Sequence, residues 1–308
     1  MRSTIATLNE LRKRAKRTYT WHDTKWGWFF AGPAALFFLI FMAYPTVNAF
    51  ILSLFKYNLM TGGTFVGVRN YVQLFTHAAF LTSLRVTALY VVGTVVPLIA
   101  IPLVVAMILN QNIRLRGFYR TLFFLPYVTS WVAIAIIFSG VYNPQGLVNY
   151  FISWFRPNAD PIFWLSSKPY ALIAIITVRI WRAFGYYMVI YLAGLQNISS
   201  IYYDQASIDG VSWWQRFWYI TFPLLSPTTV VVSLMCVTYG FQAFAVPQIM
   251  TAGGPGNSTK ILSILLYEMG FRWFKMGQAS AISVVIFVIV AAFAVFQARL
   301  SRNITVEG

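Results

Sequence analysis

Acidic side chains are scarce in this chain of 308 residues, which has seven aspartates and glutamates, two histidines and a single cysteine. All seven acidic residues fall outside the six apolar runs described below. A carrier coupled to protons or sodium normally needs ionisable groups within the membrane, so the sequence argues against ion-driven transport. The histidines, His22 and His77, are far apart and are expected at the surface, which leaves no candidate metal site.

A phosphate-binding loop for ATP is also missing. The nearest match, residues 253–260, lacks the Gly-Lys-Ser/Thr ending of such a loop. Cys236 lies alone in an apolar run, where it predicts packing rather than chemistry. No polar cluster resembles a catalytic site, so the sequence predicts no catalytic residue, no metal and no cofactor bound by this chain.

Apolar sequence is what the chain has in abundance, with 59% hydrophobic and only 10% charged residues. Soluble domains are about one quarter charged. Runs of about twenty apolar residues can cross about 30 Å of hydrocarbon, and six such runs are present: residues 28–54, 86–109, 122–142, 170–195, 222–248 and 277–296. Proline occurs in several of them, for example Pro126, and is expected to bend the helix there.

Positive charge gathers in the first residues and in the connecting loops, and the net charge is +16. This placement is typical of charge that orients a membrane protein, with the richer side in the cytoplasm, and it argues against a nucleic-acid partner. The prediction is a basic cytoplasmic tail over residues 1–27, a membrane domain over 28–298 and a cytoplasmic tail over 299–308.

The connection between the fourth and fifth runs, residues 202–227, predicts two short helices joined at a glycine. Ser199 or Ser200 can cap the first helix, Gly210 can take the left-handed conformation that ends it, and Ser212 can cap the second. The aromatic residues that follow fit either a partner's groove or the lipid headgroups. The residues alone leave both interpretations open.

The same connection resembles the cytoplasmic coupling loop, called the EAA loop, of binding-protein-dependent ABC importer permeases. Asp204-Gln205-Ala206 is followed by three residues, then Gly210, then nine residues before Ile220-Thr221-Phe222-Pro223. Asp204 stands where the family has Glu, and Gln205 where it has Ala. In that family the loop seats in a cleft of the ATPase. The resemblance implies these coupling residues: Tyr203, Asp204, Gln205, Ala206, Asp209, Gly210, Trp213, Phe217 and Pro223.

Four more segments resemble the carbohydrate, or maltose-type, branch of these permeases: residues 65–71, 120–126, 192–196 and 251–255. The resemblance implies an all-α membrane protein of about six transmembrane helices. Its function would be ATP-driven import of a sugar or oligosaccharide across a bacterial or archaeal cytoplasmic membrane. The implied partners are a second homologous permease, two ABC ATPase subunits that hold ATP and magnesium, an extracytoplasmic solute-binding protein and membrane lipid.

Polar and aromatic residues within the runs are candidates for the substrate pathway. In the fifth run these are Tyr239, Gln242, Phe244 and Gln248, which also suit ordinary packing. Arg179 and Arg182 lie three apart on one face of the fourth run, where a charge is expensive and indicates function by default. The pair suits an anionic glycan or a sugar phosphate, although the family often has a structural basic residue near Arg182.

Three alternatives remain open on the sequence. The chain could be an ABC permease for a non-sugar solute, which the ligand of its binding protein would decide. It could be an ion-coupled secondary carrier or channel, which predicts uptake without an ATPase. A membrane enzyme is the third, and the missing catalytic cluster counts against it.

Overall fold

The computed structural model describes residues 21–157 and 160–304, and the described chain divides into two units at Leu52. In the first unit, α2 (Trp21–Phe38), the π-helical turn η1 (Leu39–Ala43) and α3 (Tyr44–Ser53) follow one another without a loop. Residues Lys25–Ser53 form a helix long and apolar enough to cross a membrane, as the run over 28–54 predicts. Most of the predicted N-terminal tail, residues 1–20, lies outside the described residues.

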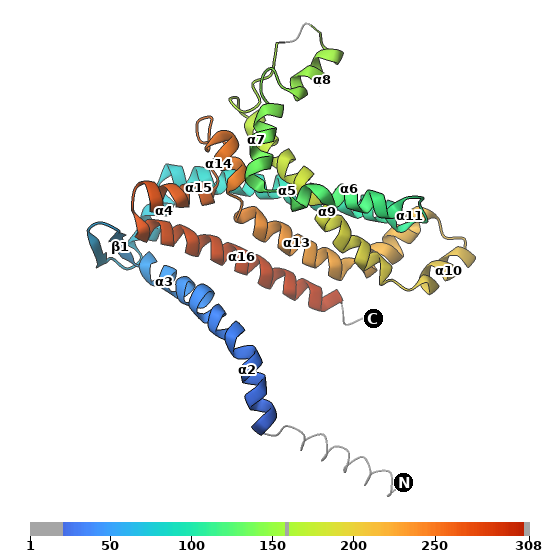
Figure 1. Ribbon diagram of the computed structural model, residues 1–308, viewed down its shortest axis with the longest axis horizontal. Helices are drawn as coiled ribbons and strands as arrows, with labels where there is room; N and C mark the ends of the chain where they lie inside the picture. Colours follow the sequence, from blue (N-terminus) through green and yellow to red (C-terminus); the bar gives the residue numbers. More distant parts are fainter. Residues whose placement is uncertain (1–20, 158–159, 305–308) are drawn as a thin grey trace, which may run out of the picture. The chain divides into compact units, whose positions relative to one another are not determined.

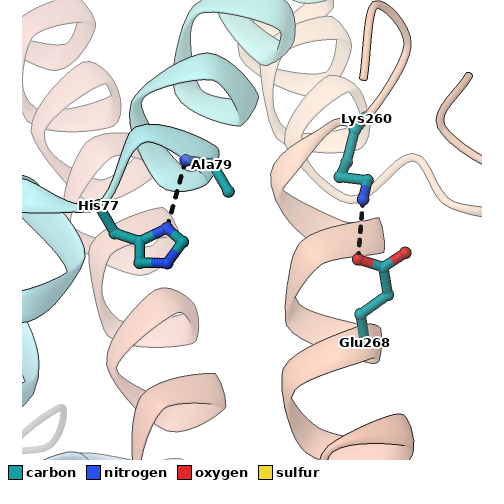
Figure 2. Close-up of polar contacts among 4 residues, drawn as sticks. All are labelled: His77, Ala79, Lys260 and Glu268. Atoms are coloured by element: carbon teal, nitrogen blue, oxygen red, sulfur yellow. Dashed lines mark hydrogen bonds and ion pairs between the residues drawn. The ribbon is translucent and has the colours of Figure 1, made fainter. Parts of the chain in front are cut away.

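Three long helices of the second unit also meet the requirements for a membrane span. They are α5 (Ala78–Asn110), α9 (Tyr170–Gln196) and α16 (Met276–Ile304). α5 starts eight residues before the predicted residue 86. The apolar run begins later than the helix because Thr82, Ser83 and Arg85 interrupt the apolar sequence. His77 caps it, and the exposed imidazole Nδ1 accepts a hydrogen bond of 3.3 Å from the backbone N–H of Ala79 (Figure 2). α16 continues into the predicted C-terminal tail, of which residues 305–308 lie outside the described residues.

The third and fifth apolar runs are not single helices. α6 (Arg116–Val128) and α7 (Trp131–Val141) meet at an angle of 96°, so α7 leaves α6 sharply (Figure 1). The fifth run begins inside a bent pair: α11 (Trp213–Arg216) and η2 (Phe217–Thr221) lead into it, and together with α12 (Phe222–Leu224) they meet α13 (Ser226–Phe241) at an angle of 67°. α14 (Ala245–Thr251) follows after a second interruption. The described residues therefore contain four continuous candidate spans, or up to six when each bent pair is counted as one span.

Short elements form the connections. β1 (Phe55–Asn58) and β2 (Gly62–Phe65) make an antiparallel hairpin, which the all-α prediction omits. The remaining connecting elements are α4 (Arg69–Thr76), α8 (Leu147–Phe155), α10 (Ser200–Ile208), α15 (Leu262–Tyr267) and η3 (Glu268–Arg272). The buried Asn70 of α4 donates its Nδ2 to the carbonyl oxygens of Ser53 (2.7 Å) and Phe55 (2.9 Å), which fixes the hairpin against α4.

The segment after α14 carries the resemblance to a nucleotide-binding loop, and its lysine is already paired. Lys260 Nζ lies 3.0 Å from Glu268 Oε2, and the Glu268 side chain is buried (Figure 2). Thr259 Oγ1 donates to the carbonyl oxygen of Gly254 at 2.7 Å. The ion pair joins the segment to η3 and the hydroxyl bond closes the segment on itself, so both contacts are structural.

The core of the second unit lies where α9 packs along α5, with α6 and α13 also against these helices. Its largest cluster includes Leu98, Tyr187, Leu192, Leu225 and Cys236, all buried. Cys236 therefore packs as the sequence predicts. α9 consequently contacts both of the broken spans, and the break in each lies beside it.

Candidate functional site

A cavity of about 490 Å³ lies where α5, α6, α7, α9, α13 and α14 meet. Five of the six predicted pathway residues line it: Arg179, Arg182, Tyr239, Gln242 and Phe244. The sixth, Gln248, lies on α14 and is absent from the lining, so the structure does not bring it to this cavity. The break between α6 and α7 and the interruption between α13 and α14 both border the cavity, since Tyr127, Trp131 and Gln242 line it.

Arg182 joins the two arms of the α6–α7 break. Its Nη2 donates to the carbonyl oxygens of Tyr127 (2.8 Å) and Thr129 (2.9 Å), and its Nε also donates to Thr129 (3.3 Å). These carbonyls have no partner within α6, because a helix leaves its last four carbonyls unpaired. The guanidinium carbon also lies 3.7 Å from the centre of the Trp131 ring, a cation–π contact. Arg182 thus satisfies the end of one helix and packs on the first residue of the next.

Arg179 makes similar contacts at the end of α13. Its Nη1 donates to the carbonyl oxygen of Tyr239 (2.9 Å) and its Nη2 to that of Cys236 (3.2 Å). Only 3% of the side chain is exposed. The Nε group is buried and has no hydrogen-bond partner among the described residues. The guanidinium carbon lies 5.8 Å from the centre of the Tyr90 ring.

Half of the other residues that line the cavity are aromatic. Tyr239 and Phe244 were predicted from the sequence. Four others were not: Tyr90, Tyr127, Trp131 and Tyr187. Each lies in an apolar run where its side chain is indistinguishable from a packing residue. Tyr127 and Trp131 flank the α6–α7 break, so prediction of the break would have been the signal for them. Ligand pockets are commonly apolar with a few polar groups that fix orientation, and this cavity has that composition.

The predicted coupling loop has the helix–glycine–helix form expected for it. Ser199 Oγ accepts from the N–H of Ile201, which makes Ser199 the cap of α10. Gly210 has a φ of +66°. The N–H groups of Gly210 and Val211 donate to the carbonyls of Ser207 and Ala206, a Schellman motif that closes the helix.

The second helix of the loop begins with a capping box. The N–H of Ser212 donates to Gln215 Oε1 (2.9 Å), and the N–H of Gln215 donates to Ser212 Oγ (3.4 Å). Tyr203 Oη lies 3.1 Å from Thr221 Oγ1, which joins α10 to η2. The loop is therefore a closed unit with hydrogen bonds of its own.

The predicted coupling residues divide by exposure. Ala206 is buried, and Tyr203 and Phe217 are partly buried, so these three support the loop from inside. The exposed members are Asp204, Gln205, Asp209, Gly210, Trp213 and Pro223. A partner that meets this loop would touch the exposed group. The structure places all nine residues on one connection between α9 and α13.

Comparison with protein families gives a match over two thirds of the chain. The family described as binding-protein-dependent transport system inner membrane component matches residues 98–306. A probable ABC transporter permease protein, YurN of Bacillus subtilis, is 34% identical and covers 87% of this chain and 94% of its own. The lactose transport system permease protein LacF of Rhizobium radiobacter is 35% identical and covers 90% of this chain and 94% of its own.

The fold is also similar to that of a solved transporter. A chain of a bacterial ABC transporter involved in the import of the acidic polysaccharide alginate superposes with a TM-score of 0.80 at 23% identity. The match covers 92% of this chain and 99% of the other. At that identity the likeness concerns the fold alone.

Proposed function

Because the chain belongs to the family of binding-protein-dependent transport system inner membrane components, we propose that it is the permease subunit of an ATP-driven importer for a sugar or oligosaccharide. The relatives in this family are transport permeases, so the chain serves transport rather than catalysis. Its apolar helices are those of an inner-membrane component.

The aromatic cavity is the observation that supports a sugar as the substrate. Six aromatic residues and a few hydrogen-bonding groups line a space of about 490 Å³, which is within the usual size of small-molecule sites. A lactose transport system permease protein is 35% identical to this chain over 90% of its length. Sugar rings offer apolar faces to aromatic side chains and hydroxyl groups to Gln242 and Tyr239.

The partners proposed for the chain follow from the loop and the family. A second homologous permease would complete the pathway, a solute-binding protein would deliver the sugar from outside, and two ABC ATPases would hold ATP and magnesium. Asp204, Gln205, Asp209, Gly210 and Trp213 form the exposed surface offered to the ATPase. A ligand or partner drives a conformational change only when it binds the two states differently, and ATP-dependent closure against this loop would supply that difference.

Orientation follows from the same assignment. The loop of residues 202–218 faces the cytoplasm if it meets an ATPase, and positive charge in the N-terminal segment favours the same side for the N-terminus. With six crossings, both termini are then cytoplasmic. The membrane would be the cytoplasmic membrane of a bacterium or an archaeon.

The test uses the whole complex, purified and reconstituted with its binding protein. We expect uptake of labelled oligosaccharide that requires ATP, and ATP hydrolysis that the loaded binding protein stimulates. Gly210→Pro should abolish stimulation and weaken association with the ATPase, because proline cannot adopt a positive φ. Gly210→Asn is the matched control, since asparagine tolerates the left-handed conformation.

Each alternative predicts a different result. Uptake that survives without ATP and ATPase would mean an ion-coupled carrier and would overturn the proposal. A binding protein that binds only amino acids or peptides would replace the sugar but keep the importer. An ATPase that associates equally with Gly210→Pro would show that residues 202–218 are not the coupling element.

A further inference from the structure

We propose that the cavity selects a sugar carrying an oxyanion, a carboxylate or a phosphate, and that Arg179 supplies the selecting charge. The inference rests on the proposed function and names its substrate class. It starts from two guanidinium groups, Arg179 and Arg182, that line one cavity near which no acidic side chain is found among the described residues that form its wall.

The charge of the cavity wall is only partly balanced. Each arginine donates to the carbonyls at the C-terminal end of a helix, Arg182 at α6 and Arg179 at α13. A helix C-terminus acts as about half a negative charge, so two ends offset about half of the positive charge of the pair. Roughly one positive charge is left over. A charge in a membrane protein's interior normally has a partner, and an anionic ligand would be that partner.

The two arginines differ in which guanidinium N–H groups already have an acceptor, and this difference points to Arg179 as the one that meets the ligand. Arg182 uses Nε and Nη2 on the carbonyls of Tyr127 and Thr129 and lies against the Trp131 ring. Arg179 donates from Nη1 and Nη2 but its Nε has no hydrogen-bond partner among the described residues, although only 3% of the residue is exposed. A buried N–H group without an acceptor is unfavourable, so an oxyanion bound beside the Arg179 guanidinium would be favoured.

The aromatic wall strengthens this selection. Tyr90, Tyr127, Trp131 and Tyr187 line the cavity together with the guanidinium groups, and the two arginines are only 3% and 7% exposed. A charged hydrogen bond is stronger in such surroundings than in water. The same rings accept the apolar faces of the sugar. A neutral sugar would use the rings alone, whereas an anionic sugar would use the rings and Arg179 together.

Equilibrium binding to the purified, assembled complex without its binding protein tests the inference. The probes are trigalacturonate and its neutral methyl ester, and glucose 6-phosphate and glucose. We expect the wild-type complex to bind one of the charged probes about tenfold more tightly than its neutral counterpart, which is the worth of a typical charged hydrogen bond. The pair that shows the preference identifies carboxylate or phosphate.

Three variants separate charge from folding. Arg179→Gln should abolish the preference, and Arg179→Lys should keep part of it because the charge remains. Arg272→Gln removes the same charge from an exposed arginine outside the cavity and should leave the preference unchanged. The preference is a ratio measured on one preparation, so a loss of folded protein cancels.

Equal affinity for charged and neutral probes in the wild type overturns the inference, as does a preference that survives Arg179→Gln or that Arg272→Gln also removes. If ATP-driven uptake of a neutral sugar is found in that case, the proposed function stands and only the selectivity falls. If the complex neither binds nor imports any sugar, the proposed function itself falls.

Discussion

A β-carbon on Gly185 would lie 1.8 Å from the carbonyl oxygen of Phe123 and 3.0 Å from the N of Phe124. These are backbone atoms of α6, so they cannot rotate away, and α6 and α9 would have to separate. We expect Gly185→Ala to lower the thermal unfolding midpoint of the complex by an amount on the order of 5 °C, the effect of overpacking by a few kcal/mol. Gly117→Ala, also on α6, meets nothing within 4 Å and should not lower it. An unchanged midpoint for Gly185→Ala would show that the two backbones are farther apart.

Asn149 on α8 is the residue that orders the connection between α7 and α9. Its Nδ2 donates to the carbonyl oxygens of Pro144 (3.0 Å) and Ile162 (2.9 Å), and its Oδ1 accepts from the N–H of Ile162 (3.2 Å) and from Trp164 Nε1 (3.2 Å). A further bond of 3.4 Å joins Nδ2 to the carbonyl oxygen of Asn143, so Asn149→Ala removes five bonds, each worth about 1 kcal/mol. Amide hydrogen exchange at Ile162 should accelerate by at least about tenfold.

The neighbouring Ser153 provides the control for that measurement. Ser153 is exposed, and its hydroxyl donates within α8 to the carbonyl oxygen of Tyr150 at 2.8 Å. Ser153→Ala should therefore leave exchange at Ile162 as it is in the wild type. Exchange that is equally slow in Asn149→Ala would mean that other contacts hold the connection.

Single residues were predictable where their role is local. Residue type predicts Ser199 or Ser200 as the cap of α10 and Gly210 as its end; Ser199 is the cap, and Gly210 ends the helix with a positive φ. Arg179 and Arg182 were recognised because charge in an apolar run is rare. Their acceptors were not, since the carbonyls of Tyr127 and Tyr239 are more than fifty residues away in sequence. Gln248 was assigned to the pathway from its type, but α14 does not turn it to the cavity.

At the level of helices, the break between α6 and α7 depends on Arg182. The carbonyls of Tyr127 and Thr129 lose their partner when Arg182 is replaced by methionine, and each unsatisfied group costs about 1–3 kcal/mol. We expect Arg182→Met to lower the unfolding midpoint more than Arg116→Gln, which removes an exposed charge at the other end of α6. Differential scanning fluorimetry of the purified complex measures both. Equal midpoints would contradict the assignment of Arg182 as a structural contact.

The helices themselves were predictable where apolarity is continuous. α9 matches its predicted run almost to the residue, because its apolar segment has polar ends. The α6–α7 break was not, since Pro126 indicates a bend but lies inside α6, and the chain turns at Thr129 and Ser130. The hairpin of β1 and β2 is too short and polar to stand out from a loop.

For the whole molecule, the single cysteine makes topology measurable. Cys236 is fully buried, so the wild-type protein should not react with a membrane-impermeant maleimide. Ser207→Cys on α10 should react only from the cytoplasmic side, and Ser153→Cys on α8 only from the outside. Labelling of intact cells and of inverted vesicles distinguishes the two. Reaction of both variants from one side would overturn the orientation proposed for the chain.

The positions of Arg179 and Arg182 on α9 have a mechanical consequence. The two residues are one helical turn apart, and one holds the end of α13 while the other holds the end of α6. α9 is therefore a common pivot for both corners of the cavity wall. Rotation of α9 would shift the two corners in concert, so the free energies of opening them cannot be independent, and losses at the two arginines should combine non-additively.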